Sequence, residues 1–423
     1  MEILRHLRPL IRRQVTADGA RRRVACDNRP RPAVLTYFVP RTMDRSFLRH
    51  LRVSRLALAA LVLSGACAGG IAPSSTPAPD PTGTPRSSPS GPMPLVDAAW
   101  PTRMREHVDL WLHSYAMLTP DSTLVPYFRR GYVERVAGVR RQRNVTTQLD
   151  ANRSTLVERF GANPSLATSG QFLPLYFESW EQMRVEIERF VRAGGNPGGA
   201  ADPSVRSYLA LLGGMFPTIA DREWLRLFSA SVDDESRRFY HDYWTAETRA
   251  RASVSGRVDT LWQRQWRPAL TRFLNNTQQQ SGELYLSLPL GGEGRTIHFG
   301  KQQNAVAVPF PDERDQADVV VYVFAHEIAG AVANAAIDDN TTPADRRSGT
   351  TSRYEQSAAV RAGALLLERT IPAVVPGYMR YYLQQTGRTP PSDPRTLFAQ
   401  VFAVPESVRD AITRQLEVIL GGI

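Results

Sequence analysis

The stretch VVVYVFAHEIAGAVANAAIDD, residues 319–339, constrains the fold more than any other part of the sequence. It is too long for a strand, and its apolar character suits a helix that is buried in a core. His326 and Glu327 lie in the middle of this run. A carboxylate is costly to bury without a partner, so this Glu needs one from a neighbouring element. We therefore expect a core helix from about Ala317 to Ile337 that carries either a satisfied buried pair or part of a site.

The sequence around this helix predicts an α+β fold that is mostly α. Residues 97–281 show the apolar spacing of several amphipathic helices. From residue 282, GELYLSLPL, RTIHF and NAVAVPFP alternate in polarity, and GGEG supplies a turn, which predicts three short antiparallel strands. The run RYEQSAAVRAGALLLERTI predicts a helix after the core helix, and further helices close the chain. We expect a helical N-terminal region at 97–281 and a second region at 282–423 with a small antiparallel sheet, the His-Glu helix and C-terminal helices.

The basic charge of the chain is concentrated near its N-terminus. Residues 1–67 hold 14 Arg and four acidic residues, whereas the rest of the chain holds 38 basic and 37 acidic residues. A body that is nearly neutral lacks the positive surface with which proteins bind phosphate backbones, so nucleic acid is not an expected partner. Both cysteines, Cys26 and Cys67, lie in the basic segment, which excludes a disulfide or a Cys-ligated metal in the body.

The segment LRHLRVSRLALAALVLSGACAGG predicts export. It has a basic start, an apolar run of about 11 residues and then small residues, which is typical of a secretory signal peptide. We expect translation to start at Met43 rather than Met1, so that residues 1–42 are a mis-assigned extension and 43–68 are the signal peptide. The end of this segment allows lipidation of Cys67 at a lipobox-like sequence, or ordinary cleavage after Ala68.

The expected location of the body is the cell envelope, in the periplasm or at the outer membrane, or outside the cell. Residues 69–96 are rich in Pro, Ser, Thr and Gly and predict a semi-extended linker. With a lipid on Cys67 this linker would tether the body to a membrane. Without the lipid, the body would be freely secreted.

A small sheet, a His-Glu helix and a following helix with a Glu resemble the gluzincin zinc metallopeptidases. In that family, HExxH supplies two His ligands and a general-base Glu, and the next helix supplies a Glu as third ligand. By this resemblance His326 is a Zn²⁺ ligand, Glu327 is the base that activates the zinc-bound water, and Glu355 is a further ligand. The resemblance covers about residues 282–385 and implies hydrolysis of a peptide or protein substrate.

The chain departs from the family pattern at Gly330, which stands where the second His ligand belongs. Asn334 and Asp338 lie about 12 and 18 Å along the helix axis from His326, too far to replace it. A catalytic zinc usually has three protein ligands, whereas the resemblance supplies two. We therefore expect an impaired or inactive metallopeptidase-like protein in which Zn²⁺ binds weakly or not at all. The alternative is a non-catalytic envelope lipoprotein that acts as a scaffold for a peptide or protein partner.

Other candidate residues have simpler interpretations. Tyr378, Tyr381 and Tyr382 include hydroxyls that could stabilise an oxyanion, but helix packing explains them more simply. His241 and His298 are interpreted as ordinary surface or core histidines, outside the site.

Overall fold

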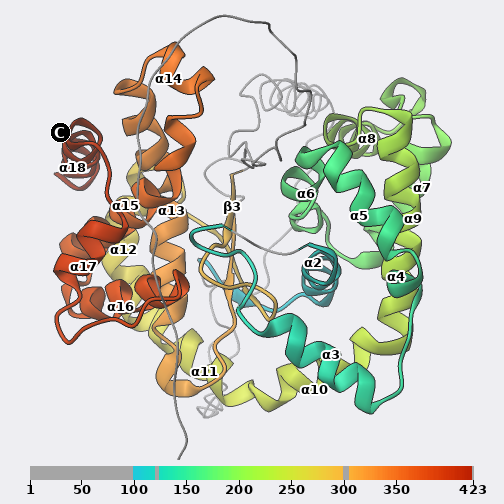
Figure 1. The fold of residues 1–423 in the computed structure, drawn as a ribbon, viewed down its shortest axis with the longest axis horizontal. Helices are drawn as coiled ribbons and strands as arrows, with labels where there is room; N and C mark the ends of the chain where they lie inside the picture. Colours follow the sequence, from blue (N-terminus) through green and yellow to red (C-terminus); the bar gives the residue numbers. More distant parts are fainter. Residues whose placement is uncertain (1–98, 120–122, 299–303, 422–423) are drawn as a thin grey trace, which may run out of the picture. The chain divides into compact units, whose positions relative to one another are not determined.

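The computed structural model describes residues 99–119, 123–298 and 304–421 (Figure 1). The expected extension at 1–42, the signal peptide at 43–68 with Cys67, and the linker at 69–96 lie outside these described residues. The fold is mostly helical with one small sheet, so the α+β class predicted from the sequence is confirmed.

The first part of the described chain is helical, as expected. Its helices are α2 (Glu106–Leu118), α3 (Tyr132–Gln142), α4 (Gln148–Ala151), α5 (Arg153–Ala162), α6 (Pro164–Ser169), α7 (Trp180–Arg192), α8 (Pro203–Met215), α9 (Ile219–Glu235), α10 (His241–Ala250), α11 (Ala252–Leu261) and α12 (Arg267–Asn276). Single π-helical turns, Ser236–Tyr240 and Trp262–Trp266, join α9 to α10 and α11 to α12. Both turns bury their aromatic residues, so the long helical stretch stays attached to the core through its irregular turns.

The sheet has four strands in the order β1-β2-β4-β3, which are β1 (Thr102–Arg103), β2 (Gly282–Ser287), β3 (Arg295–His298) and β4 (Asn304–Pro309). β1 and β4 both run parallel to β2, and only β3 pairs antiparallel, with β4. The expected antiparallel pairing therefore holds for β3 with β4, whereas β2 pairs in parallel with β4 instead of antiparallel with β3. Alternating polarity shows which residues share a face of a strand but not which strands become neighbours, and here β4 inserts between β2 and β3.

The expected core helix is present as α13 (Val319–Asp339). It is followed by α14 (Pro343–Arg347), α15 (Glu355–Thr370), α16 (Val375–Gln385), α17 (Arg395–Val401) and α18 (Glu406–Gly421). α13 packs against β4, α15 and α18. A helix over Arg314–Asp339 is long and apolar enough to cross a membrane, but 72% of its apolar window is buried inside the protein, as in the core helix of a globular domain.

The sheet separates two apolar cores. Leu284, Leu286, Val306 and Val308 face the core formed by α11–α13 and α15–α18. Tyr285, Ala305 and Ala307 belong to the other core, which they form with α2–α9. The expected regions 97–281 and 282–423 therefore share one sheet, and the described residues fall in one compact unit.

Candidate metal centre

α13 places His326 in the interior, against α15. The side chain of His326 is 0% exposed. A Cβ atom built on Gly363 of α15 would lie 2.9 Å from the His326 Cα and 2.5 Å from the Tyr378 Oη. The two helices therefore approach so closely at this level that only glycine fits at position 363, and this contact fixes the backbone that carries the imidazole.

The loop between β2 and β3 brings a second acid to this histidine. Glu293 belongs to the GGEG sequence, and its side chain is 1% exposed. Its backbone N–H donates to the Pro126 carbonyl at 3.0 Å, and the Gly291 N–H donates to the Tyr127 carbonyl at 2.5 Å. The loop is thus paired with the segment before α3, which holds Glu293 in place.

Two tyrosines of α16 hold the same loop from the other side. The Tyr381 hydroxyl donates to the Gly291 carbonyl and the Tyr382 hydroxyl donates to the Gly292 carbonyl, both at 3.1 Å. Burial raises the pKa of both hydroxyls well above the usual tyrosine value, so they stay protonated as donors. The Tyr382 ring also lies 5.3 Å from the His326 ring, centroid to centroid. These tyrosines are packing residues, as the sequence indicated, and they also fix the loop that carries Glu293.

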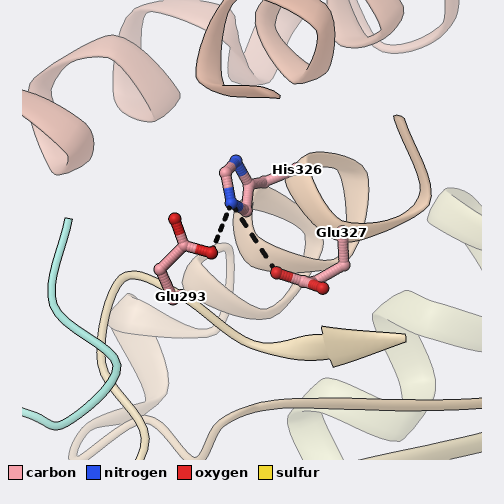
Figure 2. Close-up of side chains that lie close together, drawn as sticks. All are labelled: Glu293, His326 and Glu327. Atoms are coloured by element: carbon pink, nitrogen blue, oxygen red, sulfur yellow. Dashed lines mark hydrogen bonds and ion pairs between the residues drawn. The ribbon is translucent and has the colours of Figure 1, made fainter. Parts of the chain in front are cut away.

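Glu293, His326 and Glu327 point toward one another (Figure 2). The His326 Nε2 lies 3.1 Å from a Glu293 carboxylate oxygen and 3.6 Å from a Glu327 carboxylate oxygen. One donor atom from each of the three residues lies within 4.8 Å of the other two. Glu293, His326 and Glu327 therefore form a group that could hold a metal ion, in which Glu327 lies at a ligand position rather than only beside one.

Each carboxylate also accepts a hydrogen bond from outside the group. Glu327, whose side chain is 7% exposed, accepts from the Gly294 N–H at 3.0 Å. The other oxygen of Glu293 accepts from the Gln356 side-chain amide at 3.3 Å. These hydrogen bonds hold the carboxylates of both acids in place beside the imidazole.

The two spacings measured from the His326 Nε2 are compatible with a metal ion. Two ligand atoms about 2 Å from a tetrahedral zinc are about 3.3 Å apart, between the two distances measured from the His326 Nε2. One imidazole nitrogen and two carboxylate oxygens form a donor set that zinc accepts. The residues present therefore fit the Zn²⁺ expected from the resemblance, although by a different set of ligands.

Glu355, the expected third ligand, is not a member of this group in the described part of the chain. It is the first residue of α15, and Gln356 follows it. Successive residues of a helix are about 100° apart around its axis, so Gln356 and Glu355 face different directions. Gln356, and not Glu355, is the residue of α15 whose side chain contacts the metal group, through its hydrogen bond to Glu293.

Gly330 leaves open space one turn after His326. A Cβ atom built at this position would meet no atom within 4 Å, and the residue is half-buried. The remaining candidate histidines have other contacts: His241 binds Glu106, and His298 binds the Asn304 side chain. The structure thus leaves the position of the second His unfilled on α13, while Glu293 enters the group from the sheet side.

Glu293 is the one residue of the group that was not predicted from the sequence. GGEG was interpreted as a turn, and it does connect β2 to β3. A signal was nevertheless present, because an acid among three glycines suggests a backbone that packs too closely for side chains. A Cβ on Gly291 would lie 2.8 Å from the Phe128 carbonyl oxygen, and one on Gly294 would lie 2.3 Å from that of Ala307.

Comparison of the chain with known proteins leaves the family unassigned. No family model matches the chain, and neither a curated protein nor a solved structure matches it.

Proposed function

We propose that this chain is an exported, gluzincin-like protein in which a buried metal centre of Glu293, His326 and Glu327 has replaced peptidase chemistry. The observation that supports this proposal is the convergence of one imidazole and two carboxylates at ligand spacing in the interior. Two carboxylates beside one imidazole repel each other, and a divalent cation offsets both charges at once. The metal would be Zn²⁺ by the resemblance and by the donor set.

The contacts of Glu327 argue against an active peptidase. In the gluzincin pattern this residue activates a water molecule, which needs room for both water and substrate. Here the carboxylate is turned toward His326 and accepts a hydrogen bond from Gly294. All three side chains are at most 7% exposed. Side chains this buried give a peptide substrate little access to the metal, so the metal would stabilise the fold rather than hydrolyse peptides.

The biological role that follows is a scaffold in the cell envelope. The signal peptide and Cys67 would deliver the body to the membrane surface, and a peptide or protein partner would bind the body rather than be cleaved by it. We expect the purified protein to have no peptidase activity. Peptide cleavage that is abolished by Glu327→Gln would contradict this part of the proposal, because it would show that the carboxylate still acts on water.

Zinc removal is the first prediction. The purified chain should retain about one zinc per molecule, and a chelator should lower its thermal stability. At a free zinc concentration 100 times the Kd, binding to the folded state alone adds about 2.7 kcal/mol to the free energy of unfolding. His326→Ala should abolish zinc retention, because it removes the only nitrogen ligand of the group.

The matched control is His298→Ala, which removes an exposed histidine that binds Asn304 outside the group. This variant should keep its zinc. Zinc content can be measured by atomic absorption, and stability by thermal unfolding with and without chelator. A wild-type chain that binds no zinc and is indifferent to chelator would rule out the metal centre.

Gly330→His is the second prediction. The open space at this position admits an imidazole one helical turn after His326, on the same side of α13. The added nitrogen ligand should raise zinc affinity at least about tenfold, since even outer contacts to metal ligands change affinity by about 10–100-fold. Competition with a chromophoric chelator measures this change. If Gly330→His binds zinc no better than Gly330→Ala, the resemblance of α13 to a zinc-peptidase helix loses its support.

A further inference from the structure

Gln356 makes three hydrogen bonds that connect the metal group to the segment before α3. Its side-chain oxygen accepts from the Val125 N–H at 3.4 Å, and its side-chain nitrogen donates to the Val125 carbonyl at 3.1 Å. The same nitrogen donates to a Glu293 carboxylate oxygen at 3.3 Å. The amide is therefore held in one orientation by the backbone N–H and carbonyl of Val125 while it contacts the acid.

The orientation of Glu293 depends on this contact. One carboxylate oxygen faces the Gln356 amide, and the other lies 3.1 Å from the His326 Nε2. Rotation of the carboxylate away from the imidazole would break the bond to Gln356. Because Val125 fixes the amide, Gln356 selects the rotamer in which the second oxygen is presented to the other ligands.

We propose that Gln356 is the positioning residue of the metal centre, a neutral clamp that fixes Glu293 as a ligand. The zinc experiment that tests this inference rests on the proposed function. The contact of Gln356 with Glu293 is present in the metal-free protein and can be tested without zinc. Only an amide suits the position, because it must accept from one atom of Val125 and donate both to another and to Glu293. A carboxylate at position 356 could accept but could not donate, and it would repel Glu293.

The clamp can be tested without metal by exchanging the two side-chain types. Gln356→Glu should lower the melting temperature of the metal-free protein by several degrees, because it places two carboxylates in contact. Adding Glu293→Gln should restore much of this loss, since an amide at 293 can then donate to the acid at 356. Gln384→Glu, which adds the same charge at an exposed site on α16, should change the melting temperature little.

The rescue separates the clamp from a merely structural role of Gln356. If Gln356 acted only through Val125, the second substitution could not repair the first, and the two losses would add. The proposal would be overturned, whether or not zinc binds, if the losses in melting temperature from the two substitutions add. It would also be overturned if Gln356→Glu is no less stable than Gln384→Glu.

Zinc affinity gives the second readout. Gln356→Met keeps the side-chain volume and removes all three hydrogen bonds, and it should weaken zinc binding by about 10–100-fold, as for other contacts that orient metal ligands. Gln384→Met should leave the affinity unchanged. Unaltered affinity in Gln356→Met would show that Glu293 needs no clamp. If the wild-type chain binds no zinc, the proposed function fails, and the melting temperatures alone decide the clamp.

Discussion

Gly294→Ala should be the most damaging of the conservative substitutions, with a loss of about 3 kcal/mol or more in the free energy of unfolding. The added methyl group would lie 2.3 Å from the Ala307 carbonyl oxygen and 3.0 Å from the Glu327 Cγ. The first contact is with the backbone of the central strand β4, which cannot move aside as a flexible side chain could. The shift would also strain the hydrogen bond that the Gly294 N–H donates to Glu327. The substitution should therefore displace the metal group as well as destabilise the fold. Denaturant unfolding measures the loss.

Gly256→Ala is the matched control for this prediction. Gly256 lies inside α11, and a Cβ atom built there would meet no atom within 4 Å. Alanine forms helices better than glycine, by about 1 kcal/mol, so this variant should be slightly more stable than the wild type. Equal effects of the two substitutions would show that the close approach of the loop to β4 and α13 does not matter for stability.

The second large effect is a dependence of stability on pH that arises from Asp109. This residue of α2 is buried, and its carboxylate accepts from the Trp244 indole N–H at 2.9 Å and from the Leu288 N–H at 3.2 Å. Burial raises the pKa of Asp109 to about 7, although these hydrogen bonds oppose the shift. The folded protein therefore holds a proton at pH values where the unfolded chain has lost it.

The sign of the effect follows from this difference in proton binding. Below about pH 4 both states are protonated at Asp109, and the contribution to stability is fully present. As the pH rises toward about 7, the free energy of unfolding falls by about 1.4 kcal/mol per pH unit, about 4 kcal/mol in all from this group. Asp109→Asn, which cannot ionise, should remove this slope and be more stable than the wild type at pH 8.

Asp345→Asn is the control for the pH experiment. Asp345 is partly exposed at the start of α14, and hydrogen bonds from Thr342 lower its pKa. The contribution of Asp345 to the free energy of unfolding is present at neutral pH and is lost on acidification. This pH dependence is opposite in direction to that of Asp109. This variant should keep the slope between pH 4 and pH 7. Urea unfolding at several pH values measures the slope for both variants. An Asp109→Asn protein with the wild-type slope would show that Asp109 is not the source of the pH dependence.

The helices of this fold could be predicted well because their signal is local. The apolar run placed the core helix from about Ala317 to Ile337, and the structure has Val319–Asp339. The strands were also placed correctly along the chain, since alternation is local as well. The parallel pairing of β2 with β4 was not predicted because pairing depends on residues far apart in the chain, and β1 was missed because it has two residues only.

The candidate site was predicted in part for the same reason. His326 and Glu327 are adjacent, so a short motif reveals them, whereas Glu293 lies 33 residues before His326 and comes from a loop. Nothing in GGEG itself indicates which helix the loop will meet. Glu355 was chosen because its residue type suits a ligand, but the direction of a side chain at the start of a helix depends on where the helix begins. The contact with Glu293 is made by Gln356, which is one residue further along α15.

The sheet between the two apolar cores limits how this protein can be shortened or recombined. A fragment that began at residue 282 would expose Tyr285, Ala305 and Ala307, which α2–α9 now shield from water. Such a fragment should self-associate through that bare face, as uncovered apolar sheet surfaces do. For the same reason, any distant relative that keeps only β2–β4 and α13 must carry a different cover, built from its own sequence, over the opposite side of the strands.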